Sequence, residues 1–174
     1  MPAINVLSNN ALSNKELSIA EITGLLADLI QKKRQMLVTA ESCTGGMIAA
    51  ACTDLAGSSN WFERGFVSYS NASKTELLGV DAALIDLHGA VSKEVASAMA
   101  AGAVAHSKAQ ISVAVTGIAG PGGGSAEKPV GIVWFAWMVS GQLSSELMRF
   151  DGDRAAVRAA TLRHALQRLV TLLR

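Results

Sequence analysis

Hydrophobic residues occur along this chain in two patterns, as short apolar runs and as longer stretches with apolar positions at helical spacing. The helical pattern is clearest after Ser18, which forms a capping-box signature with Glu21 and precedes apolar residues every three or four positions. The same spacing, with caps and glycine stops, predicts helices over about 19–34, 45–55, 72–79, 81–88, 93–107 and 154–173. The short apolar runs predict strands over about 36–39, 66–70, 111–115, 130–139 and 143–150.

Strands that alternate with helices predict one α/β domain, a three-layer α/β/α sandwich. The turn signal Ser140–Gly141 makes at least one pair of neighbouring strands antiparallel, so we expect a mixed, mostly parallel sheet of about five or six strands. The domain is expected to span residues 16–174, after a flexible polar lead-in over residues 1–15. Asn71 is expected to cap the helix that ends near Gly79.

Composition narrows the classes of protein. Of the 174 residues, 50% are hydrophobic and 17% charged, which excludes a disordered chain. The net charge of +1 provides no basic field, so we expect neither a nucleic acid nor a membrane as partner. Two cysteines and three scattered histidines give no disulfide framework and no metal-ligand spacing. No targeting segment or run long enough to span a membrane is visible, so a cytoplasmic location is expected.

Unusual polar and glycine residues follow three of the predicted strands. The segments are ESCTGG over 41–46, YSNASK over 69–74 and TGIAGPGGG over 116–124. In open α/β sheets, ligands bind beyond the carboxyl ends of the strands. We therefore expect the three segments to build one site.

The first segment has two interpretations. Ser42 follows a strand and precedes a helix, so it is a candidate nucleophile, with free backbone N–H groups near Gly45 and Gly46 to hold an anion. Alternatively, Ser42 and Thr44 only cap the helix. Cys43 is a rival nucleophile, although a free cysteine is more often a small buried hydrophobic residue.

The other segments supply candidate partners for Ser42. Lys74 lies near a helix N-terminus, where partial burial would favour a neutral amine that can act as a base, although an isolated lysine is usually solvated. Tyr69 can orient a substrate or can simply be a half-buried strand residue. The glycine loop that begins at Gly117 suits close contact with a ligand or forms a flexible hairpin. One of Arg149, Arg154 and Arg158 can meet a phosphate, or all three form a solvated helix face.

Several long strings in this order resemble the CinA C-terminal domain family. They are AESCTGG, GSSNWFERGFVSYSNASK, HGAVS, TGIAGPGGGSAEKPVG and FDGDR, and the resemblance runs from about Ile22 to the C-terminus. It implies an α/β/α sandwich that forms dimers and acts as a nicotinamide-nucleotide amidohydrolase in pyridine nucleotide recycling. Some members carry a large N-terminal domain. Only about 20 residues precede the match here, so we expect a stand-alone deamidase.

The resemblance also implies roles for individual residues. Ser42 matches the nucleophile, Lys74 the proposed base and Tyr69 the site tyrosine. The residues expected to contact substrate are Thr44, Gly45, Gly46, Thr116, Gly117, Gly120 and Arg154. The implied reaction is hydrolysis of nicotinamide mononucleotide to nicotinate mononucleotide and ammonia, without a metal or organic cofactor. A non-catalytic pyridine-nucleotide-binding module and an amidase for another small amide are the alternatives.

Overall fold

A five-stranded sheet forms the centre of the computed structural model, which describes residues 16–174. The lead-in predicted over residues 1–15 lies outside the described residues. The strands are β1 (Leu37–Glu41), β2 (Phe62–Val67), β3 (Ile111–Gly117), β4 (Ile132–Val139) and β5 (Gln142–Arg149), in the spatial order β2-β1-β3-β4-β5. β1 is parallel to β2 and β3, whereas β4 is antiparallel to β3 and β5. The predicted mixed sheet is therefore confirmed, and β4 alone runs against the other four strands.

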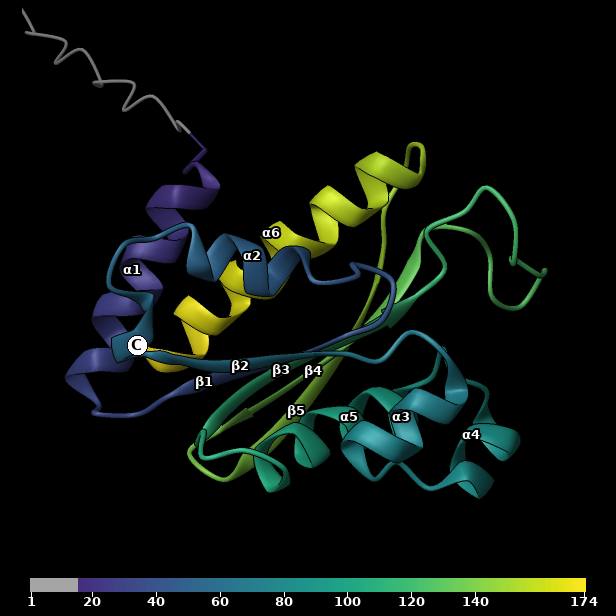
Figure 1. Ribbon diagram of the computed structural model, residues 1–174. Coiled ribbons are helices and arrows are strands. Elements are labelled where there is room, and N and C mark those ends of the chain that lie inside the picture. The colour runs from purple at the N-terminus through teal and green to yellow at the C-terminus, as the bar shows by residue number, and fades with distance from the viewer. Residues whose placement is uncertain (1–15) are drawn as a thin grey trace, which may run out of the picture.

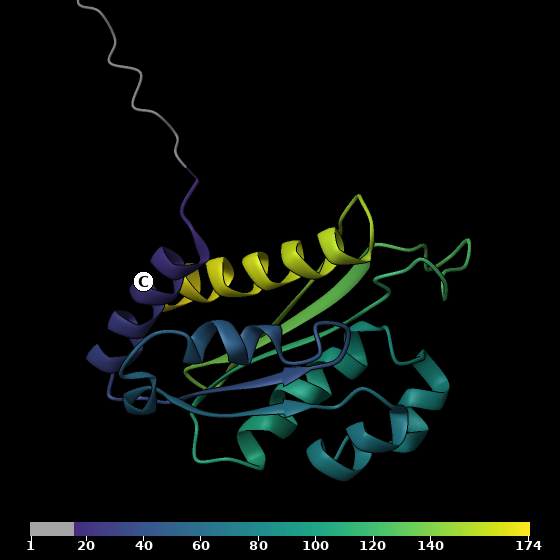
Figure 2. The same cartoon turned by 45° about the horizontal axis from the view of Figure 1, so that its top comes forward.

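Helices cover both faces of the sheet (Figures 1 and 2). One layer contains α1 (Ile19–Lys32), α2 (Met47–Thr53) and α6 (Arg154–Leu173), and the other contains α3 (Asn71–Leu78), α4 (Ala82–His88) and α5 (Lys93–Ala105). A short 3-10 turn, η1 (Ser58–Asn60), precedes β2. The three-layer sandwich expected from the sequence is confirmed. Among the described residues, no helix has both the length and the apolar character needed to cross a membrane.

Each layer buries its own apolar cluster against the sheet. On the α6 face, the buried stripe of the helix recurs every three or four residues, as in Val157, Leu162, Leu166 and Leu169. On the other face, small side chains of α5 pack against β1, β3 and β4. These two clusters fix the sheet between the layers and so fix the carboxyl ends of β1, β2 and β3 relative to one another.

The second strand differs from its predicted position over 66–70. β2 begins at Phe62 and ends at Val67, in parallel register with β1. It is an edge strand whose exposed positions do not alternate regularly, so the period-two signal is weak there. The residues after Val67 leave the sheet and start α3, whose N-cap is Ser70 rather than Asn71, because the Ser70 hydroxyl accepts from the Ser73 N–H.

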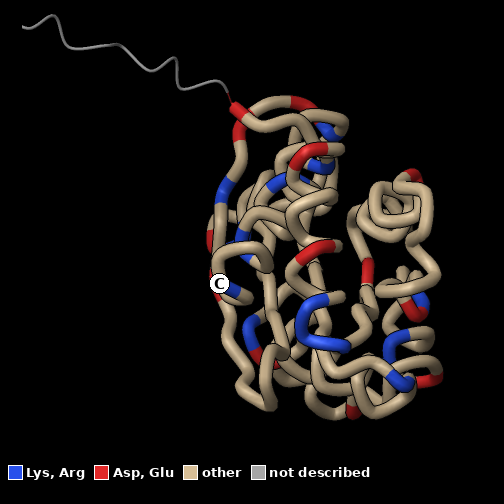
Figure 3. Tube along the Cα trace, turned by 90° about the vertical axis from the view of Figure 1, so that its left-hand side faces the viewer, with Lys and Arg blue, Asp and Glu red and all other residues tan. Residues whose placement is uncertain are grey.

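Charged residues of both signs occur along the backbone on one side of the described structure. Segments with Lys or Arg alternate with segments carrying Asp or Glu on the side shown in Figure 3, in keeping with the net charge of +1. The backbone on that side therefore carries charges of both signs, as the composition suggests.

Two helical glycines provide a test of how tightly α5 packs against α3. A Cβ on Gly102 in α5 would lie 2.0 Å from the Leu78 carbonyl oxygen, whereas a Cβ on Gly24 in α1 meets nothing within 4 Å. Gly24→Ala should therefore raise the free energy of unfolding by about 0.5–1 kcal/mol, from helix propensity alone. Gly102→Ala should lower it by about 1–3 kcal/mol, because α5 must move away from α3. Urea unfolding of both variants measures these changes, and a stabilised Gly102→Ala would contradict the packing.

Candidate active site

The three segments singled out in the sequence meet at one edge of the sheet. β1, β2 and β3 are parallel, so their carboxyl ends lie together, and the chain beyond each end contributes to the same cavity of about 210 Å³. The cavity is lined by Ser42, Cys43, Tyr69, Lys74, Ala90, Val91, Thr116, Gly117, Ala119 and Arg154. Most of the residues predicted to act on or contact a ligand therefore surround one space.

Ser42 and Lys74 are in direct contact inside this cavity. The Lys74 Nζ atom lies 3.1 Å from the Ser42 Oγ atom. It also lies 2.9 Å from the Ser68 carbonyl oxygen and 3.2 Å from the Tyr69 carbonyl oxygen. The Lys74 side chain is 1% exposed, so these oxygens replace the water that normally solvates a lysine.

The contacts of Lys74 determine what each protonation state can do. A carbonyl oxygen only accepts hydrogen bonds, so the Ser68 and Tyr69 carbonyls each require an N–H from Lys74. A neutral amine satisfies both with its N–H groups, and its lone pair then faces the Ser42 hydroxyl. An ammonium group instead donates its third N–H to Ser42. The site thus accommodates a proton that moves between Ser42 and Lys74 without rearrangement of the amine.

Burial favours the neutral state of Lys74. It lowers the pKa of the Lys74 amine below its usual value, and a charged Cys43 sulfur would act in the opposite direction. Within residues 16–174, no carboxylate forms an ion pair with Lys74 to restore the charge. Burial also raises the pKa of the Cys43 thiol to about 11, so this cysteine is a neutral thiol near pH 7. Ser42 is the better candidate nucleophile because its hydroxyl contacts the Lys74 amine, which can take its proton, whereas burial keeps the Cys43 thiol protonated.

Glu41 performs the capping that the sequence had assigned, in one interpretation, to Ser42 or Thr44. Its fully buried carboxylate accepts from the N–H groups of Gly46, Ile48 and Ala49 and from the Thr44 hydroxyl, at 2.7–3.1 Å. An acidic side chain is well placed there, at the positive end of α2. Sequence reasoning missed this role, although a glutamate before a glycine turn and a helix is the signal for it. The consequence is that the Ser42 hydroxyl is free to contact Lys74.

The backbone N–H groups at the two glycine segments are not equivalent. The Gly45 N–H donates to the Ser42 carbonyl and the Gly46 N–H donates to the Glu41 carboxylate. Neither N–H is therefore free to hold an anion, contrary to the expectation from the sequence. In the β3–β4 ladder, the Ile118 N–H donates to Ile132, and hydrogen bonds alternate along an antiparallel pair. The N–H of Gly117 is therefore directed away from β4, toward the side of β3 where Ser42 lies.

Arg154 connects the glycine loop over 116–124 to the segment over 69–74 that contains Tyr69. Its Nη1 atom donates to the Gly120 carbonyl at 2.9 Å, and its Nη2 atom donates to the Tyr69 hydroxyl at 3.3 Å. Tyr69 is 62% exposed, so its ring forms the rim of the cavity rather than part of the core. The Thr116 hydroxyl donates to the Ala90 carbonyl, which leaves it able only to accept from a ligand.

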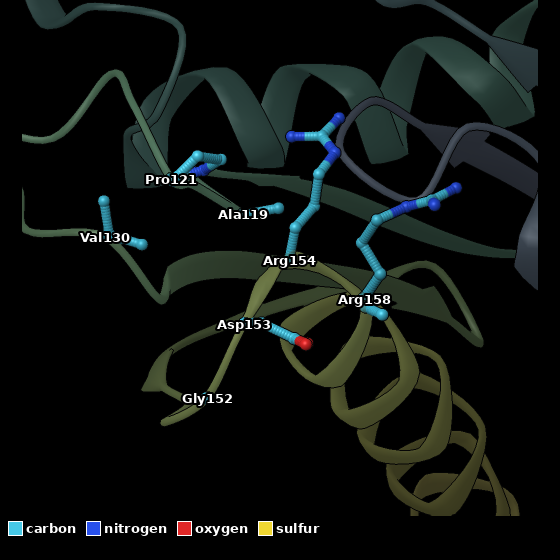
Figure 4. Close-up of a pocket in the computed structure, with 8 residues that line it drawn as sticks. Ala119, Pro121, Val130, Gly152, Asp153, Arg154 and Arg158 are labelled. Carbon is cyan, nitrogen blue, oxygen red and sulfur yellow. The ribbon is translucent and has the colours of Figure 1, made fainter.

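A second, larger pocket of about 640 Å³ adjoins the first and shares Ala119 and Arg154 with it. Figure 4 shows the Arg154 and Arg158 side chains extending from α6 in the same direction, while Asp153 points toward the first turn of that helix. The Asp153 carboxylate accepts from the Ala156 N–H there. Of the three arginines considered in the sequence, Arg149 is not among the residues that line either pocket.

Residues 19–173 match the model of the CinA C-terminal domain. The chain belongs to this family. The match covers nearly all the described residues, so the family resemblance seen in the sequence motifs is confirmed.

Individual relatives are similar over most of their length. The chain is 51% identical to the nicotinamide-nucleotide amidohydrolase PncC of Pseudomonas putida, over 88% of this chain and 96% of that one. It is 45% identical to the protein of the same name from Escherichia coli K12, over 87% and 92%. A crystal structure of the competence/damage inducible protein CihA from Agrobacterium tumefaciens superposes with a TM-score of 0.87 at 47% identity, over 90% and 96%. The first two names agree with the expectation of an amidohydrolase.

The buried Lys74 predicts a specific pH dependence of stability. Between its lowered pKa and the usual value of 10.5, the unfolded chain binds a proton that the folded protein does not, so stability rises with pH in that window. Lys74 by itself should raise the free energy of unfolding by about 1.4 kcal/mol for each unit by which its pKa is lowered, whereas the raised pKa values of Cys43 and Cys52 act in the opposite direction above about pH 9, in the wild type and in Lys74→Met alike. Lys74→Met should lack this rise, whatever its stability at neutral pH. Urea unfolding at several pH values up to about 10 measures both slopes, and equal slopes would refute the shift.

Proposed function

We propose that this protein hydrolyses nicotinamide mononucleotide to nicotinate mononucleotide and ammonia, with Ser42 as nucleophile and Lys74 as base. The observation that carries the proposal is the buried 3.1 Å contact between Ser42 Oγ and Lys74 Nζ, with two carbonyls that fix the amine. The choice of a nicotinamide nucleotide as substrate is supported by the names of the relatives, which are called nicotinamide-nucleotide amidohydrolases. A module that only binds pyridine nucleotides has no use for this contact. The cytoplasmic location expected from the sequence remains a prediction.

The first half of the reaction forms an acyl-enzyme. Ser42 Oγ attacks the carboxamide carbon while its proton passes to the Lys74 lone pair. The N–H of Gly117 is directed toward this region and stabilises the negative charge on the tetrahedral oxygen. Lys74, now an ammonium, gives its proton to the departing nitrogen. The C–N bond breaks, ammonia leaves, and Ser42 holds the nicotinoyl group as an ester.

The second half releases the acid. Water takes the place of ammonia and attacks the ester carbon, and Lys74 accepts a proton from this water. The tetrahedral intermediate then expels Ser42 Oγ, which regains its proton from Lys74. Nicotinate mononucleotide leaves, and the site returns to its starting state with one water consumed and one ammonia formed.

The two adjoining pockets match the two ends of the nucleotide. The smaller cavity holds the carboxamide next to Ser42, and the Thr116 hydroxyl accepts from the amide N–H₂. The larger pocket holds the phosphate, which Arg154 meets from the boundary between the pockets. Tyr69 lies at the rim, where its exposed ring can cover the bound nucleotide.

The substrate assignment is tested by ammonia release. Nicotinamide mononucleotide, nicotinamide and simple amides are compared side by side with purified protein. The nucleotide should give the highest kcat/KM, because remote phosphate contacts contribute to transition-state binding. Equal rates on the nucleotide and the free base would refute the proposed substrate, and a faster simple amide would favour a different amidase.

The nucleophile assignment is tested by two neighbouring substitutions. Ser42→Ala should lower kcat by more than about a thousandfold, while the fold and nucleotide binding persist, because only the attacking oxygen is lost. Cys43→Ala is the matched control and should retain most activity, since its thiol is neutral. In the parent enzyme, added hydroxylamine should trap the acyl group as a hydroxamate. An inactive Cys43→Ala beside an active Ser42→Ala would reverse the assignment.

We also propose that the protein is a homodimer formed through β5. β5 is an edge strand, and its face on the α5 side exposes Leu143 and Leu147, 45% and 48% of whose surfaces are accessible. These leucines continue the apolar surface of Met138 and Trp134, their register partners on β4. An antiparallel pairing of two β5 strands about a two-fold axis covers the open edge and brings the leucines of the two copies side by side on one face of the joined sheet.

Light scattering tests this assembly. The wild type should have twice the chain mass of 18.0 kDa at micromolar concentration, and Leu147→Glu should shift it toward the monomer. Leu87→Glu is the control, because Leu87 on α4 is even more exposed, at 78%, but lies outside the sheet. A monomeric wild type at micromolar concentration, or a fully dimeric Leu147→Glu, would contradict the β5 interface.

A further inference from the structure

Arg158 connects the larger pocket to the turn that carries Ser42. Its Nε atom donates to the Cys43 carbonyl at 3.1 Å, and its Nη2 atom donates to the Thr44 carbonyl at 2.9 Å. A Cβ on Gly45 would lie 3.6 Å from Nη2, so the guanidinium packs directly against this turn. The same side chain lines the larger pocket (Figure 4).

Among the described residues, the charge of Arg158 has no acidic partner. In the part of the chain from residue 16 to 174, no carboxylate lies within 4.0 Å of its nitrogen atoms. Asp153 lines the same pocket, but its carboxylate points toward the first turn of α6 and caps it. The Nη1 donors of Arg158 and the second Nη2 donor make no hydrogen bond in this region. They are available to an anion that enters the pocket.

We propose that Arg158 couples the phosphate of the substrate to the orientation of Ser42. A phosphate in the larger pocket binds the free donors of Arg158 and fixes the guanidinium plane. The fixed guanidinium then holds the Cys43 and Thr44 carbonyls, and with them the turn that places Ser42 Oγ against Lys74. Arg158 is a positioning residue that acts through this turn. The inference rests on the proposed deamidation, which supplies a substrate with a phosphate.

Arg154 does not have this double contact. It lines the same pocket, but its hydrogen bonds go to Gly120 and Tyr69, outside the turn that carries Ser42. A phosphate bound by Arg154 alone improves binding without changing the nucleophile. The coupling therefore predicts that the phosphate raises kcat through Arg158, beyond any effect on KM.

The test compares nicotinamide mononucleotide with nicotinamide riboside, which lacks only the phosphate. In the wild type, the riboside should show a kcat lower by about tenfold to a hundredfold. Added inorganic phosphite, which can occupy the phosphate site, should restore part of that kcat. In Arg158→Gln, kcat on the nucleotide should fall toward the riboside value, and phosphite should have no effect. Arg158→Lys should behave in the same way, because an ammonium group cannot bridge both carbonyls and the phosphate.

Arg163→Gln is the matched control. Arg163 is also on α6 and also donates to a backbone carbonyl, that of Leu17, but away from both pockets. The Arg163→Gln variant should keep the wild-type difference in kcat between nucleotide and riboside, and the wild-type activation by phosphite. The coupling is refuted if the wild type turns over both substrates with the same kcat, if phosphite does not activate the riboside reaction, or if folded Arg158→Gln keeps the wild-type ratio. The first two outcomes need no variant. A wild type that releases no ammonia from either substrate would instead refute the proposed deamidation.

Discussion

The burial of one lysine amine among backbone carbonyls is the constraint on which the site depends. Lys74 lies on α3, but its Nζ atom reaches back to the carbonyls of Ser68 and Tyr69 and to the hydroxyl of Ser42. This arrangement requires β2 to end at Val67 and the chain to turn at once into a helix. Desolvation lowers the lysine pKa, and the two carbonyls set the direction in which its lone pair points. The parallel pairing of β1 and β2 brings Ser42 to that position.

At the end of β1, a second constraint assigns helix capping to Glu41 and leaves the neighbouring Ser42 without a capping role. Helix α2 needs acceptors for its first N–H groups, and Glu41 supplies them from within the core. The serine and the backbone of β3 are thereby left for chemistry. The Glu41 carboxylate is fully buried and accepts from four hydrogen-bond donors, so it does not line either pocket. The positive side chains Arg154 and Arg158 face the pocket instead.

The sequence predicted which three loops form the candidate site, but not how its side chains contact one another. The loops after three strands could be predicted because parallel strands end at one edge and because glycine and polar residues cluster there. The contact between Ser42 and Lys74 could not, since local sequence gives a serine before a helix the same preference for capping as for chemistry. The capping role of Glu41 was missed, although its backbone partners lie only five to eight residues further along the chain. Arg158 was a candidate for the phosphate, but its contacts with the Cys43 and Thr44 carbonyls could not be predicted, because only tertiary packing brings α6 to that turn. The start of β2 was misplaced because an edge strand lacks regular alternation.

The pH dependence of kcat/KM tests the central claim, that a neutral Lys74 accepts the proton of Ser42. With a neutral Lys74 as base, kcat/KM should rise with pH through an apparent pKa below the usual lysine value, because burial disfavours the ammonium in the free enzyme. Lys74→Arg should be nearly inactive across the series, because a guanidinium keeps its proton at any working pH. Substantial activity in Lys74→Arg, with the same profile as the parent, would show that no neutral amine is needed and leave Lys74 with an electrostatic role only.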